Sequence, residues 1–175
     1  MPIKSLIRTI ADFPTPGIQY RDVTTLFKDA QGFNGVIESL AQRYRERPID
    51  VVAGIEARGF ILGAALAHNL GKGFVPIRKK GKLPGQTHQV DYALEYGVDS
   101  IEIHVDAITA GQRVLLVDDL IATGGTVLGA IALLERSGGA VEECCFIVDL
   151  PDLGGSTRLS EQGVKHFALT SFAGH

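Results

Sequence analysis

Two adjacent carboxylates followed by a glycine-rich turn form the part of this sequence best suited to chemistry. The segment VLLVDDLIATGGT (residues 114–126) joins a buried apolar run to Asp118 and Asp119, and then to the turn ATGGT (residues 122–126, the glycine turn), which opens a predicted helix. Successive N–H groups at a helix start suit a phosphate monoester. Two carboxylates beside an anion are unfavourable unless they face hydroxyl groups or a divalent cation. The pattern therefore predicts a ligand with a phosphate and vicinal hydroxyls, with Mg²⁺ as a candidate cofactor.

The alternative interpretation is an ordinary strand-to-helix turn whose aspartate and threonine residues only cap the helix. The order of strand, paired acids and Thr-Gly-Gly-Thr favours the ligand site over this alternative. Neither G-x-x-x-x-G-K-[ST] nor G-x-G-x-x-G occurs in the sequence, which argues against nucleoside-triphosphate and dinucleotide sites.

Two further loops follow predicted strands and could hold a second anion. Residues 78–82 (RKKGK) carry four cations directly after the strand candidate 73–78, and residues 56–59 (EARG) follow the apolar run 49–55. A basic run on its own is often a solvated surface loop or a nucleic-acid patch. Its place beyond a parallel strand favours capture of an anionic substrate, because ligands bind at the carboxyl ends of such strands.

Together these segments resemble the type I phosphoribosyltransferases over nearly the whole chain. Residues 114–126 are similar to the thirteen-residue phosphoribosyl-pyrophosphate signature of that family, which is highly specific. The similarity narrows to the adenine-specific branch in five segments: DFPTPGIQYRDVT (12–24), AGIEARGF (53–60), PIRKKGKLPG (76–85), YALEYG (92–97) and CCFIVDL (144–150). The resemblance implies an enzyme of purine salvage that converts adenine and phosphoribosyl pyrophosphate to AMP and pyrophosphate.

The resemblance also implies which residues contact each part of the substrates. The ribose and its 5′-phosphate are expected at Asp118, Asp119, Ala122, Thr123, Gly124, Gly125 and Thr126. Pyrophosphate is expected at Glu56, Ala57, Arg58, Arg78, Lys79 and Lys82, and adenine at Gln19, Arg21 and Leu150. Mg²⁺ is expected to bind mainly through substrate and water oxygens, with Asp118 and Asp119 as candidate protein ligands.

The expected catalytic residues are Glu95 and Tyr96, together with Arg58. By resemblance, Glu95 takes the proton from adenine N9 or stabilises cationic charge at the reacting ribose, and Tyr96 covers the sugar or bonds to pyrophosphate. The alternative for Glu95 is a solvent-facing carboxylate. For Leu150 it is an ordinary core residue, and for the segment FPTPG (13–17) a rigid connector. Two other functions also remain open: a regulator that senses phosphoribosyl pyrophosphate without catalysis, and a transferase for another base.

The elements that must position these residues alternate along the chain. Apolar spacing predicts helices over 3–11, 33–46, 59–70 and 126–137, and strands over 49–55, 73–78, 101–105, 113–117 and 141–150. Such alternation predicts an α/β fold with a parallel-sheet core flanked by helices. The resemblance specifies one type I phosphoribosyltransferase domain over 1–175, with a small base-binding hood at about 1–32 and a flexible catalytic loop at about 83–97.

Composition limits the classes of protein and the compartment. With 175 residues, 17 basic against 20 acidic side chains and a net charge of −3, a single domain is expected, and a general nucleic-acid binder is not. No apolar run has the length of a membrane helix, and the N-terminus lacks the features of a signal peptide. Cys144 and Cys145 are neighbours in a predicted strand and point to opposite faces, so reduced thiols and a cytoplasmic location are expected. The resemblance implies a homodimer.

Overall fold

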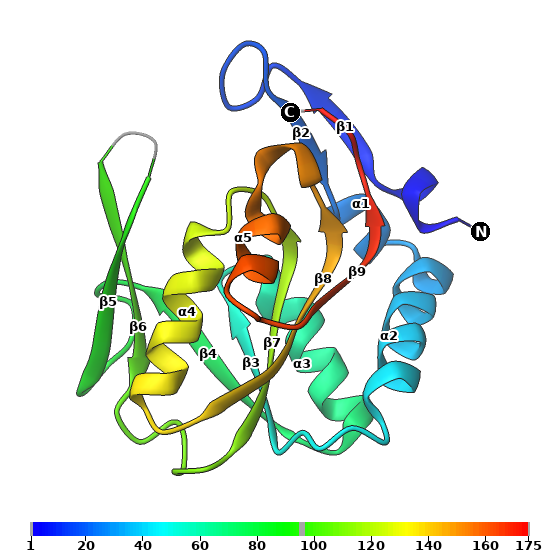
Figure 1. Ribbon diagram of the computed structural model, residues 1–175. Coiled ribbons are helices and arrows are strands. Elements are labelled where there is room, and N and C mark those ends of the chain that lie inside the picture. The colour runs from blue at the N-terminus through cyan, green and yellow to red at the C-terminus, as the bar shows by residue number, and fades with distance from the viewer. Residues whose placement is uncertain (1, 95–96, 175) are drawn as a thin grey trace.

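A seven-stranded sheet forms the centre of the molecule, and the computed structural model describes residues 2–94 and 97–174 (Figure 1). The strand order is β5-β6-β4-β3-β7-β8-β9. Five strands run parallel: β3 (Val51–Ile55), β4 (Gly73–Lys79), β7 (Arg113–Ile121), β8 (Ala140–Asp149) and β9 (His166–Ser171). The other two, β5 (Thr87–Ala93) and β6 (Val98–His104), form an antiparallel hairpin beside β4. The predicted α/β class with a parallel core is confirmed.

Helices cover both faces of this sheet, as the alternation of elements predicts. Helices α2 (Ala30–Tyr44) and α3 (Arg58–Leu70) pack on one face, and α4 (Gly125–Arg136) and α5 (Gly155–Glu161) on the other (Figure 1). Along β3, Val52 belongs to the core under α2 and α3, whereas Val51 and Ala53 belong to the core under α4 and α5. This period of two means that both faces of each central strand are apolar, which is typical of a buried parallel sheet.

The N-terminal segment differs from the helix predicted over 3–11. A short 3-10 helix covers Ile3–Leu6, and strand β1 (Arg8–Ala11) then pairs with strand β2 (Gln19–Asp22) in a separate two-stranded sheet. The helix prediction is wrong beyond residue 6 because backbone pairing with the next strand of the chain outweighs the weak local periodicity. The turn FPTPG between the strands contains a cis peptide bond at Phe13–Pro14, and the short helix α1 (Thr24–Phe27) follows β2.

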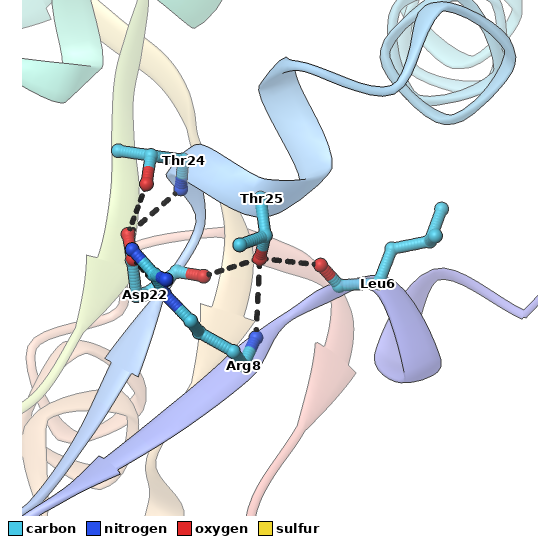
Figure 2. A network of polar contacts seen from close by, with 5 residues as sticks. All are labelled: Leu6, Arg8, Asp22, Thr24 and Thr25. Atoms are coloured by element: carbon cyan, nitrogen blue, oxygen red, sulfur yellow. Dashed lines mark hydrogen bonds and ion pairs between the residues drawn. The ribbon is translucent and has the colours of Figure 1, made fainter.

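Buried Asp22 joins this two-stranded sheet to helix α1 (Figure 2). Its carboxylate accepts bonds from Arg8 Nε at 2.6 Å, from Thr24 N at 2.9 Å and from Thr24 Oγ1 at 2.7 Å. The Thr25 hydroxyl donates to Leu6 O at 2.6 Å, which ties the first turn of the chain to α1. One residue therefore satisfies donors from both β1 and α1.

The segment at 83–97, expected to be a loop, contains a strand. Thr87–Ala93 forms β5 and pairs residue by residue with Val98–His104. Its periodicity is weak because, among residues 87–93, only Val90 and Tyr92 place large apolar side chains on the face toward α4, where they lie against Gly129. The flexible catalytic loop expected at about 83–97 stays a prediction.

The two cysteines confirm one expectation of the sequence. Cys144 and Cys145 are buried free thiols, and they belong to the cores on opposite faces of β8. In the described part of the chain, the helices are too short or too polar to span a membrane. Strand β9, helix α5 and the pair β1–β2 are elements that the sequence patterns do not predict.

Candidate active site

A cleft of about 300 Å³ opens at the carboxyl ends of β3 and β7, where the parallel sheet is expected to bind ligands. Residues from β3, α3, β4, β6, β7 and α4, and from the turns after β3 and β7, line it. The polar or glycine-turn residues among them are Glu56, Arg58, Lys79, Asp118, Asp119, Ala122, Thr123, Gly124, Gly125 and Thr126, and the apolar ones are Ile55, Ile101, Leu120, Ile121 and Val127. The structure therefore brings the paired aspartates, the whole glycine turn and two of the predicted cations into one cavity.

The two aspartates lie within β7, which runs four residues further than the predicted strand. Asp119 is 3% exposed, and Arg58 Nε donates to its Oδ2 at 2.6 Å. Asp118 Oδ1 accepts from the backbone N–H of Asp119 at 2.8 Å. Helix α3 approaches very closely here, since a Cβ on Gly59 would lie 3.0 Å from both Asp118 Oδ1 and Val117 O. This close approach places Arg58, the residue before Gly59, beside Asp119.

Burial and neighbouring charges shift the pKa values of Asp118 and Arg58 in the cleft. Burial, and then the neighbouring Asp119 carboxylate, raise the pKa of Asp118 well above its ordinary value. Burial alone would lower the pKa of Arg58, but the adjacent Asp119 carboxylate outweighs it and raises that pKa. Arg58 thus stays a cation, and Asp118 holds a proton to higher pH than an ordinary aspartate does. A carboxyl group of this kind can donate as well as accept a hydrogen bond at a sugar hydroxyl.

The residues present suit a metal ion only in part. Among residues 2–94 and 97–174, no cluster of three or more His, Cys, Asp or Glu side chains could hold a metal by itself. The Asp118 and Asp119 oxygens are hard donors at the edge of the cleft, so they fit Mg²⁺ that takes its remaining ligands from water and substrate.

Hydrogen bonds from helices α4 and α5 hold the glycine turn in its conformation. Gly124 has φ +89°, a left-handed conformation that favours glycine. Its carbonyl accepts the first α4 bond, from Leu128 N at 3.0 Å. On the side of α5, Gly155 N donates to Ala122 O at 2.9 Å, and Arg158 Nη1 donates to Thr123 O at 2.8 Å. The turn is thus held from α4 and from α5.

The predicted pyrophosphate residues fall into different surroundings. The Glu56–Ala57 peptide bond is cis, and Glu56 Oε1 accepts from Lys79 N at 2.6 Å and from Arg78 Nε at 3.2 Å. The Lys79 amine is paired with the Asp99 carboxylate. Ala57, Arg78 and Lys82 are not among the described residues that line the cleft, and Ala57 and Lys82 are exposed.

The predicted adenine residues lie outside the described lining of this cleft. Gln19 and Arg21 are on β2, where the Arg21 guanidinium donates to Thr9 Oγ1 at 2.6 Å and lies 4.4 Å from the Phe172 ring centroid. Leu150 is 7% exposed, packs in the core under α2 and α3, and bonds through its N–H to Ile121 O at 3.0 Å. Glu95 and Tyr96, the predicted catalytic pair, lie outside the described residues.

Sequence patterns miss several residues that organise the cleft. Asp99 and Tyr92 hold the Lys79 amine, with Tyr92 Oη 3.1 Å from Lys79 Nζ, and no local signal indicates this because β4, β5 and β6 meet only in the folded sheet. Gly155 and Arg158 support the glycine turn from a helix that starts 29 residues after Thr126. The doublet Gly154-Gly155 is the one local signal for that contact.

Comparison with known proteins agrees with this geometry. The family model described as "Phosphoribosyl transferase domain" matches residues 22–166. A curated relative from Nitrosospira multiformis, named adenine phosphoribosyltransferase, is 61% identical over 175 residues and covers 100% of both chains. The crystal structure of adenine phosphoribosyltransferase from Thermoanaerobacter pseudethanolicus superposes with a TM-score of 0.93 at 49% identity, covering 97% of this chain and 98% of that one.

A second solved structure was determined with ligands. The adenine phosphoribosyltransferase of Saccharomyces cerevisiae, complexed with an imino-altritol bisphosphate and adenine, has a TM-score of 0.88 and 38% identity, covering 95% of this chain and 96% of its own. Full-length identity, the family model and the shared fold agree. The chain therefore belongs to the phosphoribosyltransferase family and, within that family, to the adenine phosphoribosyltransferases.

Proposed function

We propose that the cleft transfers the 5-phosphoribosyl group of phosphoribosyl pyrophosphate to adenine, giving AMP and pyrophosphate with inversion at the ribose C1. The observation that carries this proposal is the joint lining of one cavity by Asp118, Asp119, Arg58 and the glycine turn. Relatives named for this activity, identical at most positions along the full chain, support the choice of acceptor.

The glycine turn would bind the 5′-phosphate, because its amides and the hydroxyls of Thr123 and Thr126 lie at the start of α4. Asp118 and Asp119 would orient the two ribose hydroxyls. Asp119 is already held by Arg58, so its position is set before the sugar arrives. Most of the rate enhancement would then come from positioning and preorganised charge.

Pyrophosphate would bind where cations meet the cleft. Arg58 and Lys79 line the cavity, Arg78 is the second-last residue of β4, and Lys82 follows three residues after that strand. Glu56 would act mainly by holding Arg78 and the Lys79 amide, and Ala57 would offer its backbone to the anion. When bound, Mg²⁺ would neutralise charge on the pyrophosphate leaving group, with Asp118 and Asp119 among its candidate ligands.

Adenine would bind between the N-terminal hood and the end of β8. Gln19 and Arg21 would read the base mainly through main-chain groups of β2, with Leu150 packed against the ring. Glu95 would take the N9 proton or stabilise positive charge at C1, and Tyr96 would cover the sugar. Closure of the segment 83–97 would exclude water that could trap the cationic ribose.

We also propose a homodimer and a cytoplasmic location. The homodimer is what the resemblance to the type I phosphoribosyltransferases implies. Two adjacent free thiols fit a reducing compartment. Sedimentation analysis of the purified protein tests the dimer, and a monomer at micromolar concentration would contradict it.

The experiment that tests the function is a panel of radiolabelled bases with phosphoribosyl pyrophosphate and Mg²⁺. Adenine should be converted to AMP, whereas hypoxanthine, xanthine and orotate should not react. Turnover of hypoxanthine without turnover of adenine would overturn the choice of acceptor. Tight binding of phosphoribosyl pyrophosphate with no turnover of any base would instead indicate a regulatory binding protein.

A further inference from the structure

Helix α5 contacts the glycine turn from outside the cleft. Gly155 N donates to Ala122 O at 2.9 Å, and Arg158 Nη1 donates to Thr123 O at 2.8 Å. Both acceptors belong to residues that line the cavity, whereas Gly155 and Arg158 are not among the described lining residues. Two consecutive carbonyls of the turn are therefore held on the side away from the ligand.

The direction of a carbonyl fixes the direction of the next amide. In a trans peptide unit the C=O and N–H bonds point to opposite sides, and the peptides of the turn are not among the cis bonds of the described chain. A bond from Gly155 to Ala122 O therefore turns the N–H of Thr123 away from α5. A bond from Arg158 to Thr123 O does the same for the N–H of Gly124.

The two backbones touch without intervening side chains. A Cβ on Gly155 would lie 2.5 Å from Ala122 O and 2.9 Å from Gly124 N, and a Cβ on Gly124 would lie 3.0 Å from Gly155 Cα. Such distances exclude a side chain at either position unless the turn moves. The close contact between Gly124 and Gly155 thus brings Arg158, one turn further along α5, within reach of the Thr123 carbonyl.

We propose that α5 sets the anion site of the cleft and that Arg158 is a positioning residue for the phosphate group of the substrate. By binding the Thr123 carbonyl, its guanidinium aims the Gly124 amide into the cleft and polarises that amide as a donor, because a charge-assisted bond strengthens the next bond in a chain. Arg158 does not need to touch the phosphate. This inference rests on the proposed function, since it assigns the glycine turn to the 5′-phosphate.

Variants of Arg158 test the proposal, because this side chain is exposed and its loss should leave the fold in place. Arg158→Ala should raise the KM for phosphoribosyl pyrophosphate about five- to twentyfold, near the lower end of the effect of losing a hydrogen bond to a charged group, because Arg158 acts on the phosphate only through the turn. The KM for adenine should change less than about twofold. Arg158→Lys should restore part of the affinity. Thr157→Ala, at the exposed neighbouring position of α5, is the matched control and should behave as the unmodified protein.

A spectroscopic measurement separates positioning from a general structural effect. With ¹⁵N-labelled protein, ribose 5-phosphate should move the amide resonances of Thr123 and Gly124 downfield, and Arg158→Ala should reduce that movement while the melting temperature stays the same. Equal affinities and equal amide shifts in Arg158→Ala and the unmodified protein would overturn the role of Arg158. An equal rise in both KM values would also overturn it. If the unmodified protein binds neither ribose 5-phosphate nor AMP, the proposed function fails, and the inference fails with it.

Discussion

Two Arg–Asp ion pairs in this protein contain the same chemical groups but differ in burial and in location. Arg58 and Asp119 meet at 2.6 Å in the cleft, where the Asp119 side chain is 5% exposed. Arg113, the first residue of β7, and Asp50, the residue before β3, meet at 3.2 Å. The Asp50 side chain is 37% exposed. Water screens the second pair, so it contributes little to stability. Of the two pairs, only the first lines the cleft.

Substitutions in the two pairs should therefore separate catalysis from stability. Arg58→Ala and Asp119→Asn should each lower kcat/KM by roughly 100-fold, the size of effect seen when one preorganised polar contact to a transition state is lost. Steady-state kinetics with phosphoribosyl pyrophosphate and adenine measure this, and circular dichroism checks the fold. Arg113→Ala is the matched control and should keep kcat/KM within about twofold. Loss of activity only through aggregation would contradict the assignment.

At the scale of elements, two helical glycines show how closely α3 must approach β7. Gly59 at the start of α3 has the carbonyl of Val117 and the carboxylate of Asp118 as neighbours, so an added methyl group must displace one of them. Gly35 in α2 has nothing within 4 Å of the corresponding position. The first glycine is required by packing, whereas the second only lowers helix propensity.

Alanine at these two positions should act in opposite directions. Gly59→Ala should destabilise the protein by about 1–3 kcal/mol through overpacking and should also lower activity, because it shifts Asp118. Gly35→Ala should raise the free energy of unfolding by up to about 1 kcal/mol. Urea denaturation measures both values. A Gly59→Ala variant with an unchanged free energy of unfolding and full activity would contradict this prediction and would show that α3 can shift away from β7.

The attachment of the N-terminal strands gives a prediction about pH (Figure 2). Burial alone would raise the pKa of Asp22, but the hydrogen bonds from Thr24 and Arg8 outweigh it and lower that pKa. The folded protein therefore favours the ionised form. This contribution to stability is fully present above the unfolded pKa of about 3.9 and is lost as the pH falls through the lower folded value.

Asp22→Asn should accordingly cost about 1–3 kcal/mol at pH 7, since it leaves buried donors with a weaker acceptor. The difference between this variant and the unmodified protein should shrink as the pH falls below about 4. Chemical denaturation between pH 3 and pH 7 measures it. Asp12→Asn, at an exposed position in the loop between β1 and β2, serves as the control. A difference that stays constant over this range would mean that the charge of Asp22 has no part in the attachment.

At the scale of the whole molecule, β8 crosses the interior and links the two cores. Cys145 lies in the core under α2 and α3, and Cys144 lies in the core under α4 and α5. Near the start of the same strand, Glu143 is 3% exposed and accepts from Arg43 Nε at 2.9 Å and from the Tyr44 hydroxyl at 2.5 Å. A buried carboxylate with several donors fixes the packing of α2 against β8.

The two thiols should report the opening of the whole molecule. Burial raises the pKa of Cys145 to about 12, and burial also raises the pKa of Cys144, so neither forms the reactive thiolate near neutral pH. Ellman's reagent should label neither thiol in the native protein at pH 8 and both in denaturant. Rapid labelling of one thiol under native conditions would contradict the burial of β8.

Local patterns determined much of this protein because its chemistry is concentrated in contiguous segments. The run 114–126 holds strand, carboxylates, turn and helix start within thirteen residues, so the fold class, the family resemblance and the location of the cleft follow from nearest neighbours in sequence. Helices α2, α3 and α4 also follow, since each has a clear apolar stripe.

Only the tertiary structure decided which groups meet across the chain. Residues 8–11 form a strand because β2 offers them hydrogen-bond partners, and residues 87–93 do so because of β6. Arg78 pairs with Glu56 and Lys79 with Asp99, although all of these residues look equally available in the sequence. The support of the glycine turn by α5 has the same origin. Pairings of this kind, between neighbouring strands as well as between segments twenty or more residues apart, depend on the packing of whole elements, and local residue preferences carry little information about that packing.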